Sequence, residues 1–341
     1  MKLKNSLLKR NILVFTVVFV AIAFAFLYTV DAQQLAGTPE TKDGILFRVS
    51  GGGLKKPSYI FGTIHLICSE KIFGLDELRN YIRKTDQVVM EIDLNDKKAI
   101  TESLLKSKQA TKTNPDQLKS LRSSLTTEEF EHASKIVAGK AGINLEDYGS
   151  LPTGIALLML MQQPKLYNCQ KLDSYEISLQ TITNNEKKPL VGLETYSEQI
   201  ALILNLAGSN EGENDPGKVF IKFVDNIDSS VNSLNNVVGA YRAQDLAAIA
   251  EALKPENKKE EATYFALLDK RNIAWVPKLI SLFEAKPSFA AFGAGHLAGK
   301  NGVVELLRER GYTVEPIRLR ISGADTKSAV KSKSENAISE N

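Results

Sequence analysis

Strand-like segments at both ends of the body of this chain enclose a long helical middle, and this order constrains the fold more than any other feature. Six short runs of β-prone or apolar residues are predicted strands: 45–49, 58–61, 87–92, 188–193, 288–292 and 312–319. Because the late strands must return to the same sheet as the early ones, the pattern predicts one α/β domain over residues 43–320. We expect a central mixed sheet with a helical insertion at about residues 95–180.

The helical middle carries local signals of its own. Thr126-Thr127-Glu128-Glu129 has the spacing of a capping box at the start of a helix. Gly154 to Met161 is apolar but too short to span a membrane, which favours a core helix. Residues 219–253 are expected to hold one or two helices. The long helical stretch at 258–285 contains Pro277, which should kink or divide it.

The N-terminal segment has the pattern of an export signal. Four basic residues, the last of them Arg10, precede an uncharged stretch from Ile12 to Val30. Val30-Asp31-Ala32 then puts small residues at the positions that a signal peptidase reads, with cleavage after Ala32. The stretch is also just long enough to span a bilayer as a helix. Residues 1–32 are therefore predicted to be a cleaved signal peptide or an uncleaved membrane anchor. In either case the body is exported, to the periplasm or cell envelope.

The charge of the body argues against nucleic acid as a partner. The net charge of the whole chain is +3, but without residues 1–32 the basic and acidic residues are equal in number. A neutral body offers no electrostatic footprint for nucleic acid. Contact with a membrane is expected only through residues 12–30, if they are uncleaved. The polar tail at 322–341 is predicted to be disordered.

Cys68 and Cys169 leave two interpretations open. In an exported protein they can form a disulfide, and they can equally be two ordinary buried thiols, because sequence alone does not show that their Cα atoms approach.

Four predicted strands run directly into polar residues. The first ends before His65, the next before Glu91, a later one before Glu194 and the last before His296. In open α/β sheets, ligands bind at the edge formed by the carboxyl ends of the strands. We therefore expect His65, Glu91 and His296 to converge at one sheet edge.

The two histidines share a local context. Phe61-Gly62 and Phe292-Gly293 each precede two residues, a histidine and a leucine. Two imidazoles and a carboxylate can bind a divalent metal and leave positions open for water. The same groups can act without metal, with a histidine as general base. The competing structural interpretation is that both histidines are hydrogen-bonded turn residues.

Glu91, Glu194 and Arg271 are the other candidate catalytic residues. Glu91 is expected to be a metal ligand or a general base, with a pKa raised toward neutrality by burial unless a metal opposes the shift. Glu194 can equally be the acidic first-turn residue of a helix. Arg271 can hold a substrate carboxylate or a developing oxyanion, although an ordinary surface arginine fits the sequence as well. Histidines in turns contribute little to core packing, so replacing His65 or His296 should leave the fold intact.

These residues lie in blocks that resemble the TraB/GumN family, which includes the Tiki-type metalloproteases. The resemblance runs from about residue 45 to 317 and rests on five blocks in order: Tyr59-Ile60-Phe61-Gly62-Thr63-Ile64-His65-Leu66, Val89-Met90-Glu91, Gly192-Leu193-Glu194-Thr195 with Gln199, Leu268-Asp269-Lys270-Arg271-Asn272, and Phe292-Gly293-Ala294-Gly295-His296-Leu297-Ala298-Gly299. One departure is Lys171-Leu172-Asp173-Ser174, where the family often has Gly-x-Asp. That puts Asp173 in doubt as a site residue.

The resemblance implies a fold like that of the erythromycin-esterase and ChaN group, and functional positions at His65, Glu91, Arg271 and His296. It also implies a metal-dependent peptidase using manganese or cobalt, and zinc suits the same ligands. The first hypothesis is therefore an exported metal-dependent hydrolase acting on a peptide or another small-molecule substrate. The alternative is a non-catalytic metal- or haem-binding envelope protein on the same scaffold. A third, a regulatory protein on a decayed scaffold, is disfavoured by the retained residues.

Cleavage of the export signal is directly testable. We predict that the mature protein begins at Gln33 and fractionates as soluble, because Val30-Asp31-Ala32 fits the recognition pattern for cleavage after Ala32. N-terminal sequencing of protein from fractionated cells measures this. A Met1 start in the membrane fraction would show the anchor instead.

Overall fold

The computed structural model describes residues 44–102, 119–207, 215–255 and 257–321. The predicted export segment and the predicted disordered tail lie outside these residues. The strands of the described part are β1 (Leu46–Gly51), β2 (Ser58–Thr63), β3 (Ile67–Cys68), β4 (Gln87–Met90), β5 (Leu172–Asp173), β6 (Leu190–Gly192), β7 (Ser288–Gly293) and β8 (Tyr312–Ile317). Its longer helices are α2 (Leu75–Arg83), α5 (Thr127–Lys140), α6 (Thr153–Met161), α7 (Tyr175–Asn185), α8 (Tyr196–Ala207), α9 (Pro216–Asp225), α10 (Ile227–Ala243) and α13 (Lys270–Ala285). The shorter helical elements are η2 (Ser69–Lys71), α4 (Leu121–Ser124), η4 (Leu145–Tyr148), η5 (Pro164–Tyr167), α11 (Leu246–Ala252), α12 (Lys258–Tyr264), η7 (Phe265–Asp269), η8 (Ala294–His296) and α14 (Val303–Arg308).

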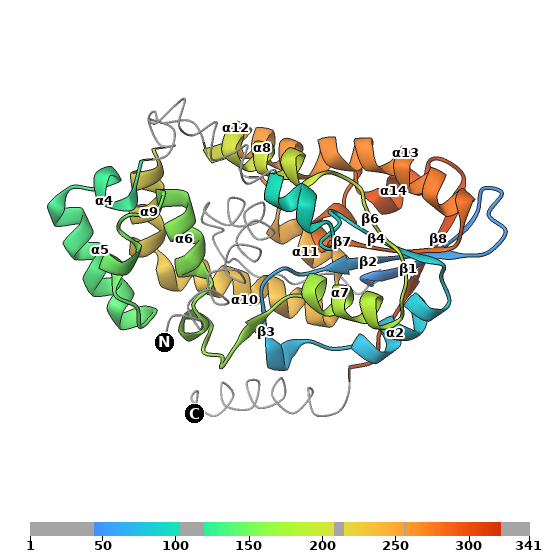
Figure 1. Ribbon diagram of the computed structural model, residues 1–341, viewed down its shortest axis with the longest axis horizontal. Coiled ribbons are helices and arrows are strands. Elements are labelled where there is room, and N and C mark those ends of the chain that lie inside the picture. The colour runs from blue at the N-terminus through green and yellow to red at the C-terminus, as the bar shows by residue number, and fades with distance from the viewer. Residues whose placement is uncertain (1–43, 103–118, 208–214, 256, 322–341) are drawn as a thin grey trace, which may run out of the picture.

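A six-stranded mixed sheet forms the centre of the molecule, in the order β6-β4-β7-β2-β1-β8 (Figure 1). β6, β4, β7 and β2 are parallel neighbours, whereas β1 pairs antiparallel with both β2 and β8. The predicted α/β fold with a mixed sheet is thus confirmed, and the first two predicted strands form an antiparallel pair. The last strand returns to pair with the first, as one continuous domain requires.

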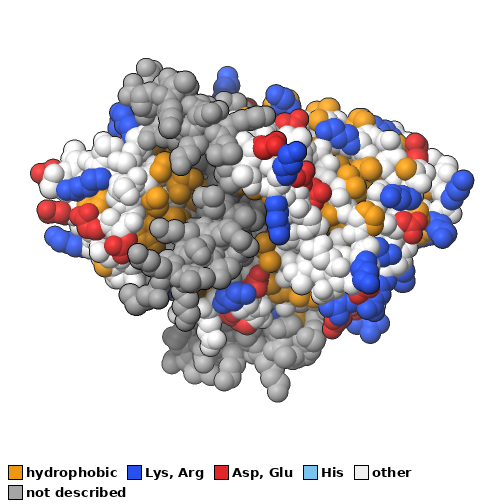
Figure 2. Space-filling view, in the orientation of Figure 1, with side chains coloured by type: hydrophobic (Ala, Val, Ile, Leu, Met, Phe, Trp, Pro, Cys, Tyr) orange, Lys and Arg blue, Asp and Glu red, His pale blue; other side chains and the backbone are white. Residues whose placement is uncertain are grey.

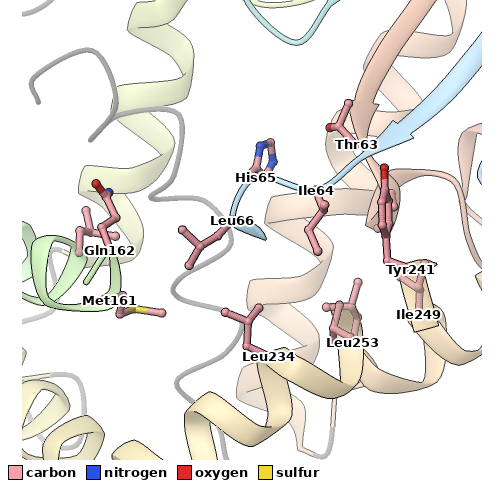
Figure 3. A pocket seen from close by; sticks show the side chains of 14 residues that line it. Thr63, Ile64, His65, Leu66, Met161, Gln162, Leu234, Tyr241, Ile249 and Leu253 are labelled. Atoms are coloured by element: carbon pink, nitrogen blue, oxygen red, sulfur yellow. The ribbon is translucent and has the colours of Figure 1, made fainter. Parts of the chain in front are cut away.

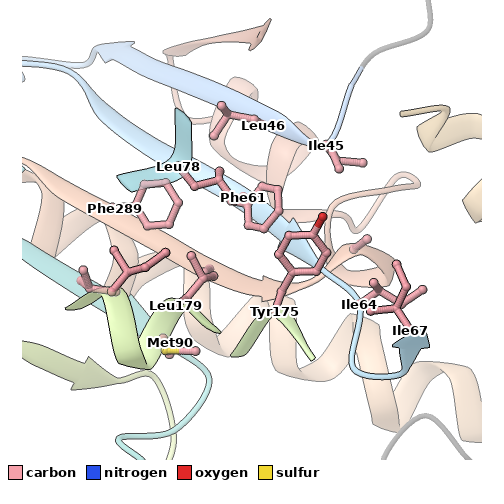
Figure 4. Close-up of a cluster of buried hydrophobic side chains, with 14 of the residues drawn as sticks. Ile45, Leu46, Phe61, Ile64, Ile67, Leu78, Met90, Tyr175, Leu179 and Phe289 are labelled. Carbon is pink, nitrogen blue, oxygen red and sulfur yellow. The ribbon is translucent and has the colours of Figure 1, made fainter. Parts of the chain in front are cut away.

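Helices cover both faces of the sheet because its strands are apolar on both sides. Phe61, Phe289 and Met90 face α2, α7 and α10, where Tyr175 is fully buried among them (Figure 4). Their neighbours in the strands, such as Ile60 and Phe292, point to the opposite face and pack against α13 and α14. This alternation is the two-residue period of a strand, and it divides the core into two layers.

A group of helices beside the sheet has a separate core. α4, α5, α6 and α9 pack on one another around a set of buried residues that includes Phe130 and Phe220. The predicted capping box is present at the start of α5: Thr126 accepts from the backbone N–H of Glu129, and the Glu129 carboxylate accepts from that of Thr126. The apolar segment before Met161 is the core helix α6, as expected.

Three local expectations were wrong. The stretch expected to be entirely helical contains β5, which pairs antiparallel with β3; two-residue strands have no periodic signal. Residues 219–253 belong to three helices rather than one or two, because α10 ends at Gln244 in a left-handed conformation (φ 56°) and Asp245 caps α11. α13 continues through Pro277, so the proline does not divide the helix, and the π-helical η7 lies just before α13.

The two cysteines lie close together. The ligand atoms of Cys68, Glu70 and Cys169 are all within 4.8 Å of one another, and both thiols are free. The two sulfur atoms are therefore near each other, without a bond between them.

The described surface is mixed in charge. Figure 2 shows Lys and Arg side chains interspersed with Asp and Glu over the visible face. Among the described residues, none of the helices combines the length and apolarity that a membrane crossing requires.

Gly62 marks the tightest approach between the two predicted histidine segments. β2 pairs in parallel with β7, with Gly62 opposite Phe292. A Cβ atom at position 62 would lie 2.5 Å from Leu297 Cδ1 and 2.9 Å from Ala294 Cα. The second of these is backbone, so it cannot simply rotate away. The glycine therefore allows the segments after β2 and β7 to pack against each other.

We predict that Gly62→Ala destabilises the fold by about 1–3 kcal/mol, the usual cost of overpacking. The control is Gly239→Ala in the exposed middle of α10, where a Cβ meets nothing within 4 Å. It should stabilise by about 0.5–1 kcal/mol, because alanine favours a helix more than glycine does. Chemical denaturation measures both. Wild-type stability in Gly62→Ala would show that the loops do not depend on this approach.

Candidate active site

The carboxyl ends of the four parallel strands bring the predicted residues to one edge of the sheet. His65 follows β2, Glu91 follows β4 and His296 ends η8 directly after β7. Nε2 of His65 lies 3.9 Å from Oε1 of Glu91, and Nε2 of His296 lies 4.0 Å from the same oxygen. The expected convergence of these side chains is present, whereas their roles remain predictions.

Gly293 lies at the centre of this convergence. Its backbone N–H donates to Oε1 of Glu91 at 2.9 Å. A Cβ atom here would be 3.3 Å from His65 Nε2, 3.5 Å from Glu91 Oε1 and 3.6 Å from His296 Cδ2. The glycine that opens the second histidine motif thus leaves the space in which three functional side chains meet.

Glu176 contacts His65 at Nδ1, the outer ring nitrogen, which faces away from Glu91. Nδ1 lies 2.8 Å from Oε1 of Glu176, a hydrogen-bond distance with poor alignment, and both side chains are buried. Burial by itself would lower the pKa of His65, but the carboxylates of Glu176 and Glu91 outweigh burial and raise the pKa above its usual value. A carboxylate beside Nδ1 favours the tautomer that carries the proton on Nδ1. The ring then presents Nε2 to Glu91.

His296 is held in the same orientation by an amide. Asn272 donates from Nδ2 to the carbonyl of Asn301, so its Oδ1 is free to face Nδ1 of His296 at 2.6 Å. Nδ1 is therefore the donor, and Nε2 accepts from Nη1 of Arg271 at 3.1 Å. Burial, and then the guanidinium of Arg271, hold the pKa of His296 well below its usual value. This imidazole is neutral, with its lone pair on Nε2.

Arg271 is buried and carries the main ion pairs of the site. Nη2 lies 2.6 Å from Oε2 of Glu91 and 2.6 Å from Oε1 of Glu194, and Nε donates to Glu194 Oε2 at 3.2 Å. Its guanidinium lies over the Trp275 ring, 4.5 Å from the centroid. The surface position that the sequence also allowed is wrong: Arg271 is 8% exposed.

The two carboxylates that pair with Arg271 have pKa values shifted in opposite directions. Burial would raise the pKa of Glu91, but Arg271, His296 and His65 outweigh it, and the pKa lies far below its usual value. The expectation of a pKa near neutrality was therefore wrong, because the sequence did not show which cation faces Glu91. For Glu194 burial prevails over Arg271, and its pKa is raised. Glu91 is the permanently ionised member of the pair.

The structure adds three residues that sequence reasoning missed as site members. Gln199 donates from Nε2 to both Glu91 and Glu194 at 3.2 Å. Asn272 and Glu176 fix the two histidines from outside. Asn272 directly follows Arg271. The two residues lie three and four positions before Trp275, a spacing that indicates a shared buried face of the helix. Glu176 had no sequence signal, because its contact with His65 depends on how α7 packs.

Both histidines are more deeply buried than expected for turn residues. His65 is 5% exposed and His296 is 3% exposed, and the His296 ring lies 4.4 Å from the Trp275 ring. The expectation that they carry little packing was wrong. His132, the third histidine of the chain, is exposed and pairs with Asp225 at 2.7 Å.

Comparison with known proteins supports the family assignment. Residues 45–316 match the sequence model of the TraB/PrgY/gumN family. The chain is 34% identical to Metalloprotease TIKI2 of Xenopus tropicalis over 91 residues, which is 24% of this chain and 17% of that protein. No solved structure matches the chain. Since the family match covers nearly the whole described part and contains His65, Glu91 and His296, this chain belongs to the TraB/PrgY/gumN family.

Proposed function

We propose that this protein is a hydrolase that cleaves peptide bonds with a divalent cation held by His65, His296 and Glu91. The observation that carries the proposal is the convergence of three acceptor atoms. The outer nitrogens of both imidazoles are directed at Glu176 and Asn272, so Nε2 of each ring faces Oε1 of Glu91, and Nε2 of His296 also accepts from Arg271. Acceptors that face one another attract a cation or a proton between them.

Each histidine lies close enough to Glu91 to share an ion with it, but the ligand atoms of His65, Glu91 and His296 are not all within 4.8 Å of one another, so one shared ion would require the two imidazoles to move closer together. Each Nε2 lies 3.9–4.0 Å from Oε1 of Glu91. Two ligands of one ion can be separated by at most about 4.2 Å, twice a typical metal–ligand bond. When bound, such an ion polarises a carbonyl group and lowers the pKa of a water ligand. Manganese, cobalt and zinc all accept nitrogen and oxygen ligands of this kind.

The charges of the site support the same proposal. Two carboxylates, those of Glu91 and Glu194, pair with the guanidinium of Arg271, and a third buried carboxylate, Glu176, lies against His65. Buried carboxylates without a matching cation are costly, so the site attracts additional positive charge. A proton on His65, whose pKa is raised, is one way to supply it, and a divalent ion is the other.

The chain's own residues have defined parts in the proposed reaction. Glu91 stays ionised and accepts from Gly293 and Arg271, which fixes its position. Arg271 is the fixed positive charge beside His296 that can stabilise an oxyanion as it develops on the substrate carbonyl. Glu194 and Gln199 hold the guanidinium and Glu91 in place.

The substrate and location are parts of the same proposal. A peptide substrate is supported by the limited similarity to a protein named as a metalloprotease. Export is supported by the basic and apolar pattern of residues 1–32. A non-catalytic metal- or haem-binding protein would retain the site without hydrolysing any peptide.

The histidines provide the first test. We predict that His65→Ala and His296→Ala lose bound metal and at least about 100-fold in peptidase activity, since each removes a proposed ligand. Elemental analysis and a fluorogenic peptide assay measure the two effects. His132→Ala is the matched control and should retain both properties. Full activity in chelator-treated, metal-free protein would refute the metal mechanism and leave a hydrolase that uses His65 as general base.

Glu91 and Glu194 provide a paired test of the ligand set. Glu91→Gln and Glu194→Gln each weaken the ion pairs of Arg271, but only Glu91 faces both Nε2 atoms. We predict that metal affinity falls at least about 10-fold in Glu91→Gln and much less in Glu194→Gln, as expected for a ligand and a more distant partner. Titration of metal-free protein with manganese measures both. Equal metal affinities of the two variants would count against Glu91 as a ligand and for its role as the base.

A further inference from the structure

An apolar cavity lies directly beside His65. Its volume is about 70 Å³, and it lies between the ends of β2 and β7 and the helices α6, α10 and α11 (Figure 3). Most of its wall consists of aliphatic side chains: Leu66, Leu158, Met161, Leu234, Ile249 and Leu253. His65 and the backbone at Ala294 and Gly295 form the side nearest the candidate active site. Both histidine motifs therefore contribute to the cavity wall.

Two polar atoms in the wall lack partners. Oγ1 of Thr63 and Nε2 of Gln162 are buried and have no hydrogen-bond partner among the described residues. Tyr241 also lines the cavity, but its hydroxyl already donates to the carbonyl of Gly62 at 2.8 Å. Buried polar atoms are normally hydrogen-bonded, so Thr63 and Gln162 indicate a ligand with polar groups of its own. A peptide has such groups beside each side chain, whereas a plain hydrocarbon chain does not.

The size of the cavity limits what it can hold. One water molecule needs about 10–15 Å³ on this measure, so 70 Å³ corresponds to about five to seven non-hydrogen atoms. Leucine and methionine side chains have about four such atoms and phenylalanine about seven. An alanine side chain would leave most of the space unfilled, and tryptophan would exceed it.

We propose that this cavity is a subsite that binds a large apolar side chain, leucine, methionine or phenylalanine, next to the scissile bond of a peptide. The inference rests on the proposed hydrolase function, because it takes the groups around His65 as the reacting centre. Burial of the side chain supplies affinity, and Thr63 and Gln162 are positioned to bond the adjoining peptide groups.

The first arm of the test measures binding without hydrolysis. The probes are N-acetyl-phenylalanine amide, N-acetyl-alanine amide and decanoate, titrated into the full chain and followed by ligand-detected NMR. We expect the phenylalanine probe to bind at least about 10-fold more tightly than the alanine probe, and decanoate to bind more weakly than the phenylalanine probe. Leu234→Trp, which fills the cavity, should abolish the preference. Equal binding of the two amides, or tighter binding of decanoate, would overturn the proposal.

The second arm uses matched cavity and control variants. Leu234→Ala enlarges the cavity, whereas Leu246→Ala removes an equally buried leucine from α11 that does not line it. In a series of fluorogenic peptides that differ at one position, wild type and Leu246→Ala should cleave the leucine and phenylalanine peptides about 10- to 100-fold better than the alanine or tryptophan peptide. Leu234→Ala should gain activity on the tryptophan peptide relative to leucine. The ratio between peptides does not depend on the folded fraction.

The two arms separate failure of this inference from failure of the proposed function. Selective binding of the phenylalanine probe without cleavage of any peptide would retain the cavity as a site for apolar residues and reject the hydrolase. Peptide cleavage with an unchanged preference in Leu234→Ala would reject the subsite and retain the hydrolase.

Discussion

β7 lies between β2 and β4 and pairs with both in parallel, and the whole candidate site depends on this arrangement. Parallel neighbours end at the same edge, so the segments that carry His65, Glu91 and His296 leave the sheet together. Gly62 also allows the segments after β2 and β7 to pack closely, because a Cβ atom there would lie 2.9 Å from the backbone of Ala294. A register shift of one residue would turn every side chain of a strand to the opposite face and separate the three groups. The strand pairing is therefore the first requirement of the chemistry.

The sequence predicted the sheet and the convergence of the site because both follow from local signals. Apolar strands and the glycines that follow them can be recognised within a few residues, and parallel pairing then places their ends together. What it could not predict depends on packing between distant segments. The pairing of β3 with β5, the left-handed end of α10 at Gln244 and the contact of Glu176 with His65 have no local pattern. For this reason, residues that only position the site residues are harder to find from sequence.

The electrostatics of the site show why burial alone does not determine a pKa. Glu91 and Glu194 are both buried beside the same guanidinium, yet the pKa of Glu91 is lowered and that of Glu194 is raised. Glu91 differs because a backbone N–H and two imidazoles also face it. Arg271 reaches both carboxylates from the first turn of α13, two residues after the π-helical η7, whose Leu267 carbonyl accepts from Nη1 of Arg271. π-Helical turns are frequent at functional sites, and this one sets the direction of a buried charge.

The reacting groups and the apolar cavity come from different parts of the fold, and they meet at His65. Strand ends hold the polar groups by backbone pairing, whereas α6, α10 and α11 form most of the cavity wall by side-chain packing alone. Changes to the wall can thus alter which side chain fits without moving Glu91 or His296. An occupied cavity also displaces water from one side of His65. With water displaced, the attraction between His65 and the carboxylates of Glu176 and Glu91 strengthens, because charges interact more strongly in a medium of lower dielectric constant. In the proposed reaction, filling the cavity would therefore change the charge environment around His65 as well as the affinity for substrate.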